Sequence, residues 1–363
     1  MAPILKFLLA DVKRWRHFEL RGLTDTWPAY PEEMCKLGHP IFTFLQDTRD
    51  VEAAPLLRSI SLSRCNAYFA SKGAVFQPVR FQEPIPLFGG LALDALRDVS
   101  SLLVGVHVDW AQSSLRNLTS LTLKYHSSGV MPSLDQFLDI LSGCPELRHL
   151  SIVGWGPQSF WILESSSCDI YFGFVDVDSS YALKVLSLFH FPSVQSLALE
   201  DVSFTLHPME LEHENATSIL DWLTQSNAST VIPRTACGIP LNGILSLQLD
   251  SIHASVPAFS RLFSALTSLQ KLGLFNVGDL TLRLLYPSSN SESDPCHRDH
   301  HPCPNLRELM CRNVDPTTLV EVVKSRVYLI PQYSDDPLTH DDSDFVDMIE
   351  DVGVKFYTRT FET

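Results

Sequence analysis

An apolar residue, two others, an apolar residue, one other and a final apolar residue form a pattern that recurs along the 363-residue chain. Clear copies lie in RNLTSLTL, which ends at Leu123, and in SLQKLGL, which ends at Leu274. The last two apolar positions alternate with polar ones, which is typical of a short strand with one buried face. Nine copies end at Leu20, Leu62, Leu103, Leu123, Ile152, Leu199, Leu249, Leu274 and Cys311. The segment 170–177, IYFGFVDV, reads as a further, eroded strand between two of them.

Helical periodicity fills several intervals between these strands. In segment 133–144, Leu134, Phe137, Leu138 and Leu141 fall on one face of a helix, and Ser133 with Gln136 forms a capping box. Three further helices are predicted over 217–226, 257–269 and 316–326, the last two with Pro257 and Asp315 at their starts.

Stacking is the physical reason for such a pattern. One strand–helix unit cannot bury its apolar face alone, whereas stacked copies can. Successive copies are 20 residues apart (Leu103 to Leu123) to 50 apart (Leu199 to Leu249), which fits leucine-rich repeats of about 20–29 residues with insertions. The sequence therefore predicts an α/β leucine-rich-repeat solenoid, or horseshoe, with a parallel concave sheet, convex helices and irregular repeats.

This pattern divides the chain into three parts. Residues 1–14 are expected to form a lead-in helix that caps the solenoid, and residues 15–332 the repeat domain, with an insertion loop over about 286–302. Residues 333–363 form an acidic segment with a closing helix and strand, which we interpret as solvated, a basic partner being the alternative. Trp110, Trp155 and Trp161 are interpreted as packing residues, with recognition anchors as the alternative.

Charge and cysteine usage exclude several classes of protein. The formal net charge of −15 argues against broad nucleic-acid binding and against an anionic membrane surface. No apolar run approaches the ~20 residues of a transmembrane helix, and the N-terminus lacks the pattern of a signal peptide. The eight cysteines form no CxxC pair, so we expect reduced thiols in an intracellular protein of the cytoplasm or nucleus.

One segment carries the residue types of a metal site. Cys296, His300 and Cys303, within CHRDHHPC, could supply a tetrahedral zinc site, but no second ligand pair is obvious. We interpret the segment as a solvated insertion loop and expect no cofactor. Two residues separate Cys303 from the lead apolar residue of the next strand, and the same spacing holds for Cys144 and Phe191, so packing already explains Cys303.

The residues between the apolar strand positions are the candidate functional surface. Alternation sends them to the concave side, where they form a mixed-charge surface without any catalytic motif. The candidate partner-binding residues are Lys124, His149, Glu200, Asp250, Phe275 and Arg312. They suit a broad contact with a protein.

Several stretches of the chain resemble the F-box/leucine-rich-repeat proteins expanded in mushroom-forming fungi. These are KRWRHFEL (13–20), GVHVDW (105–110) followed by LRNLTSLTL (115–123), and CPNLREL with LVEVVKSR towards the C-terminus. The resemblance covers about residues 13–358 and implies a non-enzymatic substrate-recognition protein. In that family an N-terminal F-box of three helices binds the Skp-type adaptor of a cullin–RING ubiquitin ligase.

The F-box is the point of departure from that family. Fourteen residues precede the first predicted strand, enough for at most four helical turns, so we expect this chain to lack the adaptor-binding module. Two alternatives stay open: a complete ligase receptor whose F-box lies upstream, and a zinc-binding or hydrolytic protein using Cys296–Cys303.

Overall fold

The computed structural model describes residues 7–22, 47–48, 54–64, 84–102, 107–126, 131–154, 163–164, 169–174, 182–183, 185–186, 189–201, 215–228, 239–286, 302–327 and 355–356. The chain forms two compact units, one mainly from residues 1–192 and the other mainly from residues 193–363. Each unit contains a parallel sheet accompanied by helices, which confirms the predicted α/β class.

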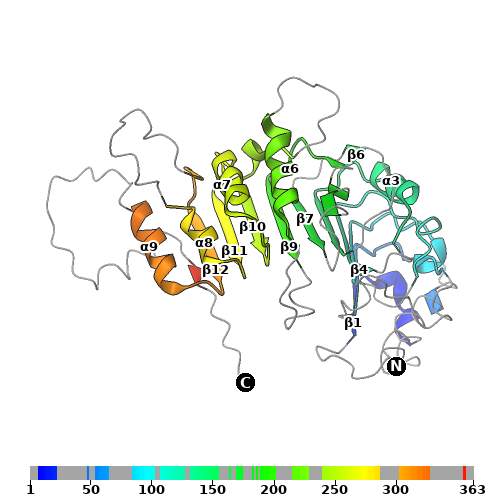
Figure 1. Ribbon diagram of the computed structural model, residues 1–363. Coiled ribbons are helices and arrows are strands. Elements are labelled where there is room, and N and C mark those ends of the chain that lie inside the picture. The colour runs from blue at the N-terminus through cyan, green and yellow to red at the C-terminus, as the bar shows by residue number, and fades with distance from the viewer. Residues whose placement is uncertain are drawn as a thin grey trace, which may run out of the picture. The chain divides into compact units, whose positions relative to one another are not determined.

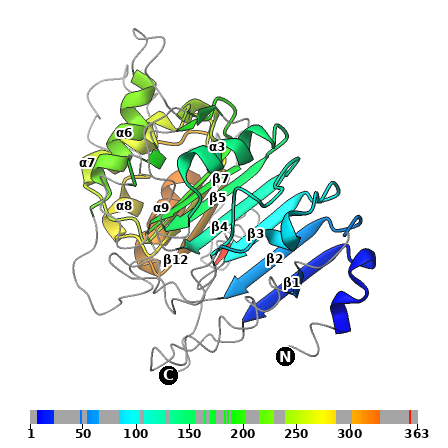
Figure 2. The same cartoon turned by 90° about the vertical axis from the view of Figure 1, so that its right-hand side faces the viewer.

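In the first unit, the strands of consecutive repeats, which we call rungs, pair side by side in parallel (Figure 2). Their order is β1 (His17–Gly22), β2 (Ser59–Arg64), β3 (Asp98–Leu102), β4 (Ser120–His126), β5 (His149–Gly154) and β7 (Asp169–Phe174). Two short strands, β6 (Leu163–Glu164) and β8 (Phe189–His190), form a separate parallel pair. Helix α3 (Leu134–Ser142) connects β4 to β5, and a 3-10 turn, η1 (Val12–Arg14), precedes β1.

The second unit repeats the arrangement. Its strands follow in the order β9 (Ser196–Asp201), β10 (Ser246–Asp250), β11 (Lys271–Phe275), β12 (Glu308–Arg312) and β13 (Lys355–Phe356). Its helices are α6 (Thr217–Ala228), α7 (Val256–Ala265), α8 (Asp279–Arg283) and α9 (Pro316–Val327). Figure 1 shows α7, α8 and α9 along one side of β10, β11 and β12, so the described helices of this unit cover one face of its sheet.

The apolar strand residues form continuous ladders. Leu20 pairs with Leu62, Leu123 with Ile152, and Leu249 with both Leu199 and Leu274. All but Leu20 are at most 2% exposed. Burying one such side chain contributes about 1.5–3 kcal/mol, so the ladders are the main source of cohesion within each unit. The alignment of rungs expected from the sequence is confirmed within each unit.

A fourth apolar residue belongs to nine of the repeats, three positions before the lead residue. Its carriers are at most 5% exposed: Val12, Ala54, Leu93, Leu115, Cys144, Phe191, Leu241, Leu266 and Cys303. In the sequence this position was recognised only at Cys144, Phe191 and Cys303. The full repeat motif is therefore longer than the one used to find it.

One rung lies at a different place from its prediction. The copy expected to end at Leu103 is β3, in which Val99 pairs with Ile60 and Leu121, and Ser101 pairs with Leu62 and Leu123. Serine occupies the second ladder position of this strand, so the alternation of apolar residues is clearer at the following leucines, Leu102 and Leu103, than at the strand itself. The placement at Leu103 is wrong by two residues. The eroded strand over 170–177 is confirmed as β7, whose Ile170 pairs with Leu150.

The predicted helices are present with small differences. In α3 the capping box of Ser133 and Gln136 is formed, but the buried face is Leu134, Phe137 and Ile140 rather than Leu138 and Leu141. Those two leucines are half-buried, because the helix contacts the sheet through a narrower stripe than the apolar face suggested. The predictions for 217–226, 257–269 and 316–326 correspond to α6, α7 and α9.

Some predicted segments lie outside the described residues. These are residues 1–6, most of the insertion loop over 286–302, and the acidic segment from 333 apart from β13. Strand β13 runs parallel to β12, as expected of a closing strand. Among the described residues, no helix has the length and apolar character needed to cross a membrane.

Candidate functional site

Because side chains alternate along a strand, every second residue of each strand lies on the sheet face opposite the helices, which we call the open face. In the second unit the row nearest the carboxyl ends of the strands consists of Glu200, Asp250, Phe275 and Arg312, paired in that order by strand register. Four of the six predicted partner-binding residues are therefore direct neighbours. The ladder residues that alternate with the open-face residues along each strand are buried, so this row belongs to the accessible face of the sheet.

Asp250 is the centre of a polar network in the second unit. One of its carboxylate oxygens accepts hydrogen bonds from Asn276 Nδ2 at 2.7 Å and from Ser251 Oγ at 3.1 Å. The other accepts from the Arg312 guanidinium at 3.0 Å. The Asp250 side chain is only 14% exposed, so this ion pair is less screened than an ordinary surface pair.

Phe275 lies between the two charged groups in strand order. The Arg312 guanidinium carbon is 5.2 Å from the centroid of the Phe275 ring, a cation–π geometry. The ring also lies close to Gly273, where an added Cβ would meet ring atoms at 3.3 Å. Glycine at 273 therefore lets the phenyl ring lie flat on the strand, where Arg312 covers it. Two rows away, at the amino ends of the same strands, Lys271 Nζ and Glu308 Oε1 form an ion pair at 2.9 Å.

The first unit carries a different polar cluster. His149 Nδ1 and Asp169 Oδ2 are 2.7 Å apart on adjacent strands β5 and β7, with both side chains partly exposed. Lys124 Nζ lies 4.5 Å from the centroid of the Tyr171 ring. Between these pairs, the buried Ser151 Oγ has no hydrogen-bond partner within the described part of the chain. A buried hydroxyl is inaccessible to a substrate, so this cluster is not a nucleophile–base pair.

The structure thus divides the predicted site between the two units. Lys124 and His149 lie in the first unit and the other four residues in the second. Sequence reasoning missed the partners Asp169 and Tyr171, although the alternation of β7 would have placed both on the open face. It also missed Ser251 and Asn276, which adopt left-handed backbone conformations (φ 56° and 53°) immediately after their strands. The residue types that most often adopt this conformation include Asn, which is the signal that could have identified Asn276.

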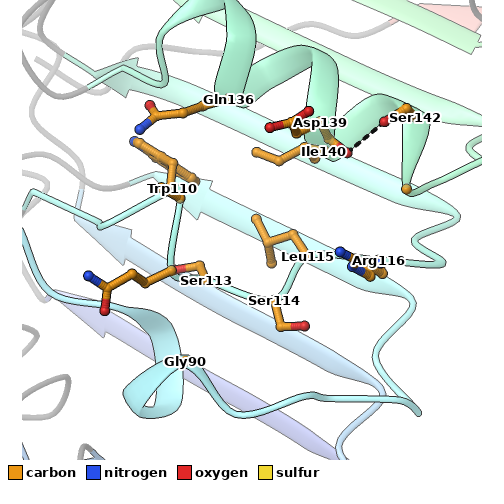
Figure 3. Close-up of a pocket in the computed structure, with 13 residues that line it drawn as sticks. Gly90, Trp110, Ser113, Ser114, Leu115, Arg116, Gln136, Asp139, Ile140 and Ser142 are labelled. Atoms are coloured by element: carbon orange, nitrogen blue, oxygen red, sulfur yellow. Dashed lines mark hydrogen bonds between the residues drawn. The ribbon is translucent and has the colours of Figure 1, made fainter.

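A cavity of about 580 Å³ lies in the first unit, between the segment 110–116 and helix α3 (Figure 3). Its apolar lining comes from Trp110, Leu115 and Ile140, and its charged lining from Arg116 and Asp139. Trp110 is 4% exposed, in agreement with the packing role expected of it. Trp155 and Trp161 lie outside the described residues.

Of the candidate metal ligands Cys296, His300 and Cys303, only Cys303 lies within the described residues. Cys296 and His300 lie outside the described residues, and Cys303 is buried with its Sγ 3.4 Å from the Phe263 carbonyl oxygen. Cys144 and Cys311 are also buried and form no disulfide, and burial raises the pKa of both thiols, to about 12 for Cys311. In the described ranges no cluster of three or more metal-ligating side chains occurs.

Comparisons with known proteins assign no family to this chain. No family model matches it, and no curated protein matches it significantly.

Proposed function

We propose that this chain is a leucine-rich-repeat solenoid that acts as a non-enzymatic protein-interaction scaffold, with the open face as its binding surface. The observation that carries the proposal is the charged and aromatic row Asp250, Phe275 and Arg312, held in fixed geometry on three adjacent strands. Arginine and aromatic side chains are enriched among residues that dominate protein–protein binding.

Preorganisation strengthens this argument. Binding usually costs the conformational freedom of long side chains. Here the Arg312 side chain is already held by Asp250 and by the Phe275 ring, and Lys271 is held by Glu308. A partner that docks on these groups loses less entropy than one that must order them, so the surface is suited to a protein contact.

The resemblance to fungal F-box proteins refines the proposal: the partner would be a protein recognised as a substrate for ubiquitination. The Skp-type adaptor would bind only if an F-box belongs to the natural protein. Co-purification with that adaptor tests this refinement separately. An intracellular location accords with the buried thiols of Cys144, Cys303 and Cys311, which form no disulfide.

The test uses an ion-pair swap. In K271E/E308K the two charges of the open-face pair exchange places, so the pair is retained while the local charge pattern is reversed. The matched control is D221R/R261D, which exchanges the Asp221–Arg261 pair between helices α6 and α7, away from the open face. The free energy of unfolding of both variants is expected to lie within about 0.5 kcal/mol of the wild-type value, because exposed ion pairs contribute little to stability.

The measurement is affinity purification from the native cell followed by mass spectrometry. Proteins captured by wild type and by the helix-side control, but lost with the open-face swap, identify the partner. If the open-face swap captures the same proteins as wild type in the same amounts, this surface is not the binding site.

A further inference from the structure

The cavity of about 580 Å³ beside helix α3 in the first unit presents two opposite charges that are not paired with each other. Among the described residues that line it, the charged ones are Arg116 and Asp139, and both are exposed. Within the described part of the chain, neither side chain has an ion pair or a hydrogen bond. One cation and one anion in the same cavity are therefore available to a ligand.

The two charges stand on opposite walls of the cavity. Figure 3 shows Asp139 on the helix and Arg116 on the facing segment. The Arg116 stem lies over Gly143, directly after the helix, where an added Cβ would be 3.3 Å from Arg116 Cγ. The Asn117 amide donates to the Gly143 carbonyl oxygen at 2.8 Å, which joins the segment to the end of the helix. Arg116 is thus held at the negative end of the α3 dipole, which favours a cation.

Two carboxamide side chains line the same cavity. Gln136 Oε1 accepts from the Ser133 amide at 2.9 Å in the capping box, so the orientation of this carboxamide is fixed. Its Nε2 group and the Gln112 carboxamide have no partner within the described ranges. A carboxamide offers both a donor and an acceptor, which is the combination that a peptide group also carries. These two side chains are therefore suited to hydrogen bonding with a peptide bond.

Apolar surface completes the cavity. Trp110, Leu115 and Ile140 contribute to its lining and are each at most 4% exposed. Because these side chains are already fixed in the core, they can contact an apolar group of a ligand without losing further conformational freedom.

We propose that this cavity binds a short zwitterionic peptide, with its carboxylate at Arg116, its ammonium at Asp139 and its peptide group at the carboxamides. Arginine matches a carboxylate in bidentate geometry, and an ammonium donates to a carboxylate. Ligand cavities usually measure about 300–1,000 Å³, so a volume of 580 Å³ suits a di- or tripeptide rather than a folded partner. The cavity is separate from the open-face row of the second unit, and the inference does not depend on the function proposed above.

A zwitterion fits these groups better than a ligand with charge of one sign. A nucleotide or another polyanion would meet a single cation and would be repelled by Asp139, and a polyamine would be repelled by Arg116. A neutral apolar ligand would take water away from both charges without replacing it, which costs free energy.

The test removes one charge at a time, from the ligand and from the protein. The probes are the dipeptide leucyl-leucine, its N-acetylated form, which lacks the ammonium, and its C-terminal amide, which lacks the carboxylate. The variants D139N and R116Q remove the matching charges of the cavity. The controls D135N and R58Q make the same changes at exposed residues of the first unit that are not among those lining the cavity. Isothermal titration calorimetry measures binding to the full chain.

We expect wild type and both controls to bind leucyl-leucine within about twofold of one another, and to bind each capped form about tenfold more weakly. In D139N the N-acetylated form should bind as tightly as the free dipeptide, because the group that recognises the ammonium is gone. In R116Q the C-terminal amide should bind as tightly as the free dipeptide, for the corresponding reason.

Three results would overturn the proposal. The first is absence of leucyl-leucine binding to wild type at millimolar concentration. The second is binding of both capped forms to wild type as tightly as the free dipeptide. The third is discrimination by D139N and R116Q between free and capped dipeptides to the same degree as by their controls. The first two results need only the wild-type protein, so they do not depend on the folding of any variant.

Discussion

In the second unit, single residues directly after the strands form the turns and connect neighbouring strands through side-chain hydrogen bonds. Ser251, Asn276 and Asn313 all have positive φ, and each lies two residues after the last ladder residue of its strand. Asn276 donates to Asp250 and Ser251, and its own side-chain oxygen accepts from Asn313. Asn276 thus adopts a left-handed backbone conformation and also connects three neighbouring rungs through its side chain.

Replacing Asn276 separates these two roles. N276A loses the hydrogen bonds and places a Cβ in the left-handed region without local compensation, so we expect a loss of about 2–4 kcal/mol in the free energy of unfolding. N276G loses the same bonds but relieves the backbone, and should be less destabilised than N276A. Urea unfolding of both variants measures the difference. Equal losses would show that the backbone conformation contributes nothing.

Asp315 controls the start of α9. Its carboxylate accepts from the Thr318 amide at 2.9 Å, and this hydrogen bond holds the pKa of the carboxyl below its ordinary value. A carboxyl whose pKa is lower in the folded state stabilises the fold above the unfolded-state pKa, and that contribution is lost as the pH falls through the folded-state pKa.

The corresponding variant is D315A. Its melting temperature is expected to be lower than that of wild type near neutral pH, and this difference should shrink as the pH falls from about 6 to about 3. Thermal unfolding across this range checks the prediction. D315N serves as control, because its amide oxygen retains the acceptor without titrating. A difference between wild type and D315A that stays constant with pH would contradict it.

At the scale of the elements, periodicity was enough to predict most strands and helices. Each copy with leucine or isoleucine at its ladder positions was placed in the correct register, and the caps of α3 and α9 were read from Ser133, Gln136 and Asp315. The failures have a physical cause. At Ser101 a polar residue stands in a ladder position, and α8 is too short to show a helical period.

The ladder itself can be tested at the element scale. Leu249 is fully buried between Leu199 and Leu274, so L249A leaves a cavity and is expected to cost about 2–5 kcal/mol. The neighbouring Gln248 is on the open face, and Q248A should change stability by less than about 0.5 kcal/mol. Chemical denaturation of the two variants compares them directly. Similar values for both would mean that β10 is not held through its ladder face.

At the scale of the whole molecule, sequence reasoning identified the open-face residues but not how they are connected. Alternation placed Glu200, Asp250, Phe275 and Arg312 on one row, because strand periodicity is a local property. The Asp250–Arg312 ion pair joins residues 62 positions apart in the chain, and no spacing in the sequence encodes it.

The backbone hydrogen bonds between the starts of neighbouring strands have a consequence for how such a chain diversifies. At the starts of β2, β3, β4, β5, β10, β11 and β12, two successive amides share one carbonyl oxygen at the start of the preceding strand, as the amides of Gln270 and Lys271 share that of Leu245. The position of a strand is thereby set by its neighbour, whatever the length of the connecting segment. Connecting segments can therefore be lengthened, shortened or exchanged during evolution, or grafted by an engineer, without shifting the strands they join.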